Sequence, residues 1–285
     1  MRKTLRLESP AKINLLLRIL RKRKDGYHEI QTLFQKISLH DTLRFSLTKE
    51  KGIFITTDHP RLPTDRRNLV YPAARAMLER SNYPGGLKID IQKKIPLGAG
   101  LGGGSSNAAT TLKALYRLLE VNLSRAELMR IGLELGADVP FFFMEGAAVG
   151  SGIGERLEKI DLPELWFVLM NPNFEVSTAW AYQNSVLTRK AFHYNIQELL
   201  RTSEGIARIL RNDLEACVSK AHHEIMTMKE MLRSTEALGA LMSGSGPTVF
   251  GVFPGEGAAS KAYRKIRDKV REEGWIVLKA RSIAT

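Results

Sequence analysis

The chain has 285 residues, which is enough for one large domain or two ordinary ones. Its composition, 44% hydrophobic and 26% charged, is typical of a globular protein and excludes a disordered one. Its formal net charge of +13 fits a solvated basic surface, a nucleic-acid-binding protein or a protein that attracts small polyanions such as nucleotides. The single cysteine, Cys217, excludes an internal disulfide framework and favours a reducing, cytoplasmic setting. Neither a signal peptide nor a membrane-spanning segment is predicted.

The chain up to residue 95 predicts mainly strands. Over residues 10–20, apolar side chains alternate with others such as Lys12 and Asn14, which is typical of a strand. Asp25-Gly26 is favourable turn chemistry. We expect a helix to begin after Asn68, and further strands over residues 42–47, 52–57 and 87–92.

Residues 96–110, "PLGAGLGGGSSNAAT", place five glycines ahead of a predicted helix over residues 108–119. Glycine is costly to order, so a segment this bare suggests that something must approach its backbone closely. Bare amides at the start of a helix form an anion site, since the N–H groups and the helix dipole point at the ligand. Ser105 or Ser106 is expected to cap the helix, and either hydroxyl could reach a phosphate or its magnesium.

Other interpretations of this segment fit less well. Residues 98–103 match G-x-G-x-x-G, but the preceding strand alternates with charge and no strand with an acidic end follows the helix, as a dinucleotide fold requires. Gly104 stands where a Walker A motif needs lysine. A flexible glycine loop would explain the bare backbone but neither the serines nor the helix behind them.

Beyond the glycine-rich segment the chain again mixes helices and strands, so both halves of the chain contain both. A helix is predicted from Ser124, with Glu127 completing a capping box and Gly136 ending it, and residues 137–144 then predict a buried strand. A change of composition at residues 161–165 marks a domain boundary. Beyond it we expect strands over 165–170 and 247–253, helices over 212–233 and 259–270, and a last strand from Trp275.

Several stretches carry a family resemblance. "PLGAGLGGGSSNAA" resembles the second motif of the GHMP kinases, and "LMSGSGPTVFGVF" resembles their third, glycine-rich motif. "SPAKINLLLRI", "RKDGYHEIQTLFQ" and "LGADVPFF" are similar to the GHMP kinases of the non-mevalonate isoprenoid pathway. The similarity covers essentially the whole chain.

The resemblance implies an α+β fold of two domains. Residues 1–160 would form an ATP-binding domain like domain 2 of ribosomal protein S5, and residues 161–285 a ferredoxin-like domain. It also implies transfer of a phosphoryl group from ATP, with magnesium, to the 2-hydroxyl of a cytidyl diphosphate ester of methylerythritol. No nucleic acid, membrane or obligatory protein partner is expected.

The resemblance also implies roles for individual residues. The catalytic roles fall on Lys12 and Asp138. Substrate binding falls on Asn14, Tyr27, His28, Tyr182 and Gly244. ATP binding falls on Asn68 and the glycine-rich segment: Pro96, Leu97, Gly98, Ala99, Gly100, Leu101, Gly102, Gly103, Gly104, Ser105, Ser106 and Asn107.

Some alternatives stay open on the sequence. Without the resemblance, the favoured role of Asp138 is to cap the turn before Pro140. Lys12 is compatible with either a solvated strand lysine or a functional one, and a core residue is the alternative for Tyr182. No acidic residue is assigned to magnesium, and the adjacent His222-His223 pair lacks the spacing of a zinc site. Rival functions are another small-alcohol kinase of the mevalonate or homoserine type, and an RNA-binding module.

Overall fold

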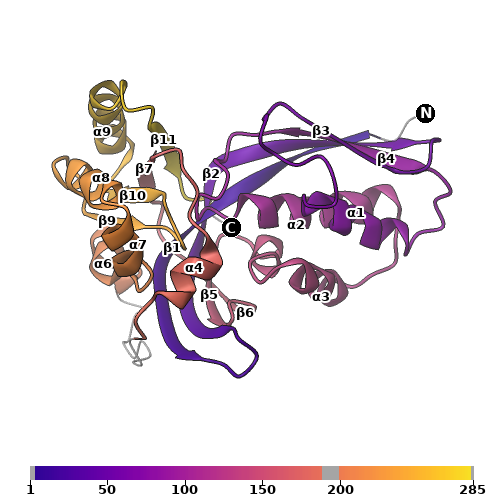
Figure 1. The fold of residues 1–285 in the computed structure, drawn as a ribbon, viewed down its shortest axis with the longest axis horizontal. Coiled ribbons are helices and arrows are strands. Elements are labelled where there is room, and N and C mark those ends of the chain that lie inside the picture. The colour runs from indigo at the N-terminus through magenta and orange to yellow at the C-terminus, as the bar shows by residue number, and fades with distance from the viewer. Residues whose placement is uncertain (1–3, 188–198, 284–285) are drawn as a thin grey trace. The chain divides into compact units, whose positions relative to one another are not determined.

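The structure is a computed structural model that describes residues 4–187 and 199–283 (Figure 1). The chain divides into two compact units. Unit 1 comprises the described parts of Met1–Ala11, His40–Ile95 and Gly102–Met144, and unit 2 comprises those of Lys12–Leu39, Pro96–Leu101 and Glu145–Thr285. Two long strands, β1 (Thr4–Lys22) and β2 (His28–Thr48), contribute residues to both units.

Unit 1 is a sheet with helices on one face (Figure 1). The end of β2 pairs antiparallel with β4 (Gly86–Gln92), which pairs in parallel with β3 (Ile53–Thr57). Alternation decides which face is covered, because Ile89 and Ile91 are fully buried while Lys88 is exposed. The helices that pack together here are α1 (Val70–Leu78), α2 (Gly103–Leu118) and α3 (Arg125–Leu135).

The predicted capping box of α3 is confirmed. The Ser124 hydroxyl accepts from the Glu127 amide, the Glu127 carboxylate accepts from the Ser124 amide, and Gly136 ends the helix.

The predicted serine cap of α2 is wrong. Gly102, at φ +67°, precedes the helix without any side-chain cap, and both serines lie inside the first turns. The helix begins at Gly103, ahead of residue 108, where the apolar spacing had placed its start.

In unit 2, the first half of β2 pairs antiparallel with β5 (Ala147–Gly152), and β5 pairs with β6 (Arg156–Ile160). Strand β1 pairs in parallel with the short β8 (Arg211–Asn212). The buried strand predicted over residues 137–144 is wrong, because this segment forms a turn and the 3₁₀ helix η1 (Pro140–Phe143) in unit 1. Three consecutive phenylalanines made the segment look like a strand, but Pro140 fixes a helical φ at its first position.

A second sheet of unit 2 has the strand order β11-β7-β10-β9, all antiparallel. Numbered within this sheet, the order is 4-1-3-2 with helices after the first and third strands, which is the ferredoxin-like arrangement. The predicted ferredoxin-like fold and α+β class are confirmed. The strands are β7 (Trp166–Asn171), β9 (Gly239–Met242), β10 (Val249–Phe253) and β11 (Ile276–Arg281).

Helices cover one face of this second sheet and share a core with it (Figure 1). Met170 and Val249 of the sheet lie in one buried cluster with Met228 and Ile266 of two helices. The helices of this region are α4 (Thr178–Gln183), α6 (Ser203–Ile209), α7 (Glu215–Ala221), α8 (Glu224–Arg233) and α9 (Glu256–Lys269). Within the described ranges, no helix has both the length and the apolar character needed to cross a membrane.

Candidate functional site

Lys12 lies in β1 with its side chain buried. The residue is 4% exposed, and Nζ donates a hydrogen bond to Asn14 Oδ1 at 2.6 Å. The ammonium also lies 5.4 Å from the centre of the Phe34 ring. A buried ammonium needs protein partners of this kind. The interpretation of Lys12 as a solvated strand lysine is therefore wrong.

Three motifs that are far apart in the sequence meet around Lys12 in unit 2. The backbone N–H of Asn14 donates to Ser243 Oγ at 3.3 Å, and Ser243 Oγ donates to the Gly100 carbonyl at 3.0 Å. A Cβ on Gly244 would lie 3.3 Å from Lys12 Nζ and 3.2 Å from Asn14 Oδ1. The predicted catalytic lysine, the glycine-rich segment and the third motif thus form one cluster.

Gly100 shows why this cluster needs bare backbone. Its φ is +72°, which side chains rarely adopt, and a Cβ would lie only 2.1 Å from the Ser243 carbonyl oxygen. The same segment is tied to β1, because the Lys12 amide donates to the Leu101 carbonyl at 2.9 Å. Close packing of two main chains therefore accounts for part of the glycine content, alongside any role in binding phosphate.

The rest of the glycine-rich segment opens helix α2 in unit 1. The first bond of the helix runs from the Ser106 amide to the Gly102 carbonyl at 2.8 Å. The amides of the three residues before Ser106 therefore precede the helical ladder and are available to an anion. Ser105 is half-buried, whereas Ser106 is fully buried and its hydroxyl accepts from Ser9 Oγ at 2.8 Å.

Asn107 has an unusual environment in this helix. The residue is 1% exposed, and its Oδ1 has no hydrogen-bond partner within the described parts of the chain. A buried unpaired amide oxygen is uncommon, since it loses hydration without compensation. This oxygen is an acceptor, so it suits a water molecule or a cation rather than a phosphate oxygen.

Asp138 is half-buried in the turn between α3 and η1. The turn lies beside the start of α2, because a Cβ on Gly136 would be 3.9 Å from Ser105 Oγ. Within unit 1, the turn that carries the predicted catalytic Asp138 and the predicted phosphate-binding helix are thus neighbours. The Val139 amide donates to the Gly136 carbonyl at 3.0 Å, which closes the turn.

Two cationic side chains hold the far end of η1. Lys113 Nζ of α2 donates to the Phe142 carbonyl at 2.6 Å, and Arg125 Nη2 of α3 donates to the Phe143 carbonyl at 2.8 Å. Positive charge is favourable at the carbonyl end of a helix, so both side chains stabilise η1 there. The segment that carries Asp138 is thereby anchored to both neighbouring helices.

Asn68 lies just before α1, where its side chain shapes a turn. Its Oδ1 accepts from the Val70 amide at 3.2 Å, and its Nδ2 donates to the Pro63 carbonyl at 2.8 Å. The start of α1 is close to the start of α2, since a Cβ on Gly104 would lie 3.7 Å from Leu69 Cδ1. This position is compatible with a nucleotide on α2, and a contact of Asn68 with adenine stays a prediction.

The predicted substrate-binding residues Tyr27, His28 and Tyr182 belong to unit 2. His28 and Tyr182 stack, with ring centroids 5.3 Å apart and planes inclined by 24°, whereas Tyr27 is 59% exposed in its turn. Burial, and after it the positive charge of Lys22, lowers the pKa of His28 below its ordinary value. The lowered pKa favours the neutral ring, which has one nitrogen to donate and one to accept. Tyr182 also packs against the hydrophobic cluster of this unit, so it has a partly structural role.

A buried ion pair supports the approach to the glycine-rich segment in unit 1. Asp41 is fully buried, and its Oδ2 accepts from Lys93 Nζ at 2.5 Å. Its Oδ1 accepts from the amides of Lys94 and Ile95 at 2.8 and 2.9 Å. The carboxylate therefore fixes the backbone just ahead of the glycines, while Lys93 neutralises it.

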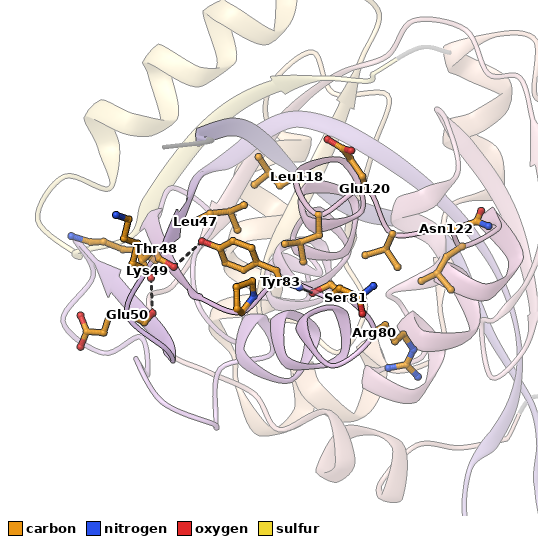
Figure 2. Close-up of a pocket in the computed structure, with 16 residues that line it drawn as sticks. Leu47, Thr48, Lys49, Glu50, Arg80, Ser81, Tyr83, Leu118, Glu120 and Asn122 are labelled. Carbon is orange, nitrogen blue, oxygen red and sulfur yellow. Dashed lines mark hydrogen bonds between the residues drawn. The ribbon is translucent and has the colours of Figure 1, made fainter. Parts of the chain in front are cut away.

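Elsewhere in unit 1 lies a hollow with a volume of about 1550 Å³, and Figure 2 shows the residues that line it. It is lined by residues 47–50, 80–84, 88 and 118–123, and Tyr83 Oη donates to the Thr48 carbonyl across it at 2.7 Å. It lies at the C-terminal end of α2, about 24 Å from the glycine end of that 16-residue helix at 1.5 Å per residue. None of the predicted site residues lines it, so it is separate from the candidate site.

Comparison with known proteins identifies the family. Residues 68–146 match the GHMP kinases N terminal domain, and residues 193–272 match the GHMP kinases C terminal domain. A 4-diphosphocytidyl-2-C-methyl-D-erythritol kinase of Syntrophus aciditrophicus is 50% identical over 261 residues, 90% of this chain and 93% of that protein. The chain belongs to the 4-diphosphocytidyl-2-C-methyl-D-erythritol kinase family of GHMP kinases.

Further relatives agree with this family. The kinase of the same name from Citrifermentans bemidjiense is 43% identical and covers 99% of this chain and 100% of its own. A crystal structure of 4-(cytidine 5'-diphospho)-2C-methyl-D-erythritol kinase superposes with a TM-score of 0.84 at 33% identity, covering 99% of this chain and 100% of that one. A homoserine kinase from Cytophaga hutchinsonii gives a TM-score of 0.76 at 21% identity, covering 100% of this chain and 96% of its own, and so shares the fold.

The geometry adds residues that sequence reasoning missed. Thr32 contacts Asn14, Ser243 joins the third motif to Gly100, and Asn212 Nδ2 donates to the Gly244 carbonyl at 2.7 Å. The first two fall inside stretches that resemble the family, so their polar side chains were the available signal. Asn212 had no such signal, because only the pairing of β8 with β1 brings it here.

Replacing Gly100 with alanine should weaken nucleotide binding by roughly tenfold or more. The new Cβ would require both a strained φ and displacement of the Ser243 carbonyl, each of which costs about 1–3 kcal/mol. Calorimetric titration with ADP measures the affinity.

Gly257→Ala is the matched control for this substitution. Gly257 lies in α9, where a Cβ would meet nothing within 4 Å. Alanine there should leave ADP affinity unchanged and stabilise the protein by about 0.5–1 kcal/mol. Normal ADP affinity in folded Gly100→Ala protein would contradict the close approach seen here.

Replacing Asp41 with asparagine should destabilise the fold by about 3–5 kcal/mol, because it leaves a buried ammonium without its counter-charge. Adding Lys93→Met should recover part of this loss, since the stranded charge is then gone. Urea unfolding of both single variants and the double variant gives the coupling free energy, expected at about 1–3 kcal/mol. Strictly additive effects would show that the pair is not coupled.

Proposed function

We propose that this chain transfers the γ-phosphoryl group of ATP to the 2-hydroxyl of 4-diphosphocytidyl-2-C-methyl-D-erythritol. The observation that carries the proposal is the cluster of Lys12, Asn14, Gly100 and Gly244 in unit 2, in which three sequence motifs of the family converge. The family membership supports the substrate. We also propose that the protein is cytoplasmic and that the boundary between its two domains lies between residues 160 and 161.

The nucleotide phosphates are proposed to bind along the glycine-rich segment. The amides at the start of α2 and the positive end of its dipole attract anions. The net charge of +13 adds a general attraction for ATP and for the diphosphate of the substrate. An RNA-binding function would leave this segment without a role, so the kinase is favoured.

The oxygen donors near this helix fit magnesium, which prefers oxygen ligands and usually takes few of them from the protein. We propose the Ser105 hydroxyl as one candidate ligand, since the Ser106 hydroxyl is already engaged by Ser9. Asn107 Oδ1, buried and without a partner among the described residues, is a second candidate for the ion or for water bound to it. The bound ion would neutralise charge on the phosphates.

In the proposed reaction, Asp138 accepts the proton of the substrate 2-hydroxyl as that oxygen forms its bond to the γ-phosphorus and ADP departs. A carboxylate within hydrogen-bond reach of a hydroxyl is suited to this role. The Lys12 ammonium orients the hydroxyl and stabilises the negative charge that develops. Phosphoryl transfer depends mainly on positioning and charge stabilisation, which accords with a lysine fixed by Asn14.

The cytidyl end of the substrate is proposed to bind at Tyr27, His28 and Tyr182. A planar base can stack on an aromatic ring, and the neutral His28 can hydrogen-bond its edge. His28 and Tyr182 stack on each other, while Tyr27 is 59% exposed. Closure of Tyr27 over the base would complete the clamp.

Asp138→Asn should lower kcat for the cytidyl substrate by roughly a hundredfold or more, as expected for loss of a general base. Binding of ATP and substrate should largely persist, because the amide is nearly isosteric. ADP release by the unmodified protein is measured with the cytidyl substrate, mevalonate and homoserine in parallel, and kcat of the variant is measured with the cytidyl substrate. Turnover of mevalonate or homoserine instead of the cytidyl substrate would overturn the proposed function, and near-normal kcat in the folded variant would overturn the role of Asp138.

Tyr182→Ala should raise the KM for the cytidyl substrate by roughly fivefold to a hundredfold, because a stacking contact is worth about 1–3 kcal/mol. The KM for ATP should hardly change. Tyr182→Phe keeps the ring and is the matched control, with near-normal kinetics expected.

An NMR titration of His28 gives an independent readout for these variants. Burial is the main cause of its lowered pKa, so removing the Tyr182 ring should raise that pKa toward the ordinary value of histidine. An unchanged substrate KM in Tyr182→Ala, together with a raised His28 pKa, would mean that the ring supports His28 but does not bind cytosine.

A further inference from the structure

A chain of buried polar side chains extends from Lys12 away from the glycine motifs. Lys12 Nζ lies 2.6 Å from Asn14 Oδ1, and Asn14 Nδ2 lies 2.8 Å from Thr32 Oγ1. Thr32 Oγ1 lies 2.7 Å from the Leu16 carbonyl oxygen. The three side chains are almost completely buried, with exposures of 4%, 1% and 0% from Lys12 to Thr32.

The chemistry of these groups fixes the direction of every bond in the chain. The Leu16 carbonyl can only accept, so the Thr32 hydroxyl donates to it. The hydroxyl oxygen then accepts from the amide nitrogen of Asn14, which can only donate. The amide oxygen of Asn14 is thereby turned toward Lys12, whose ammonium can also only donate.

Packing fixes the rotamer of Thr32 as well. Thr32 pairs with Gly150 across the antiparallel strands β2 and β5. A Cβ on Gly150 would lie only 2.9 Å from Thr32 Cγ2, so the methyl group uses the space that the glycine leaves. With the methyl group held there, the hydroxyl points at Asn14 and Leu16.

We propose that Thr32 is a positioning residue for Lys12, an inference that rests on the catalytic role given to Lys12 in the proposed function. The Thr32 hydroxyl selects one of the two orientations of the Asn14 amide. In the selected orientation an oxygen faces the ammonium. In the other orientation the amide NH₂ would face it, and two donors would repel each other.

The decisive variant is Thr32→Val, which keeps the branched shape beside Gly150 and removes only the hydroxyl. The Asn14 amide then loses its acceptor and its preferred orientation. We expect kcat to fall by roughly tenfold to a hundredfold, as misplacement of a catalytic group does, with the KM for ATP within about twofold. Thr32→Ser restores the hydroxyl and should restore most of kcat. Should the valine variant not fold, Thr32→Ala removes the same hydroxyl with a smaller side chain.

Ser282→Ala is the control for a general loss of stability. Ser282 is 4% exposed, and its hydroxyl accepts from the Leu165 amide at 2.9 Å, outside the Lys12 cluster. Its removal should lower the melting temperature without lowering kcat. A fall in kcat for Thr32→Val no larger than that for Ser282→Ala, or a serine variant as slow as the valine variant, would overturn the proposal.

Lys12→Met separates the two proposals. If Lys12→Met abolishes turnover while Thr32→Val does not lower kcat, the positioning role of Thr32 is overturned and the catalytic role of Lys12 stands. If Lys12→Met retains turnover, the catalytic role of Lys12 is overturned and the inference about Thr32 falls with it. Low kcat in both variants, with rescue by Thr32→Ser, is the result expected.

Discussion

The burial of one ammonium group constrains much of the candidate site. Lys12 is 4% exposed, and a charge removed from water must be compensated by oriented polar groups. Asn14 supplies the amide oxygen, and the Phe34 ring supplies an electron-rich face. Gly244 leaves room for the ammonium because it has no side chain. A residue that is costly to bury and so closely surrounded is better explained by chemistry than by stability, since a hydrophobic side chain would fill the same space without that cost.

A comparable constraint acts on the glycine-rich segment, whose two ends belong to different units. Asp41 holds the backbone ahead of it through two amide hydrogen bonds, and in unit 2 Gly100 packs directly against the Ser243 carbonyl. Glycines are flexible by themselves, but neighbours on both sides restrict these. Amides that are already in place lose little conformational entropy when a phosphate binds, which favours binding.

The two predicted catalytic residues are held by different physical means. Lys12 is fixed by buried hydrogen bonds between strands, whereas Asp138 lies in a turn between two helices. Lys113 and Arg125 anchor η1, the element next to that turn, through its carbonyl end. Asp138 itself is half-buried, which accords with its proposed role as proton acceptor for a bound substrate.

The sequence by itself determined the elements with strong periodicity and the capping box of α3, because alternation, helical spacing and capping are local properties. It also determined the family, and through it the α+β class, since each motif is an unbroken stretch of the chain. Local signals failed where a proline competed with three phenylalanines at η1, and where glycines rather than serines began α2. Only the tertiary structure decided that Thr32, Ser243 and Asn212 serve the Lys12 cluster, because their partners are 18, 229 and 32 positions away in the chain. Hydrogen bonds between such distant residues depend on strand register, and no local pattern in the sequence records that register.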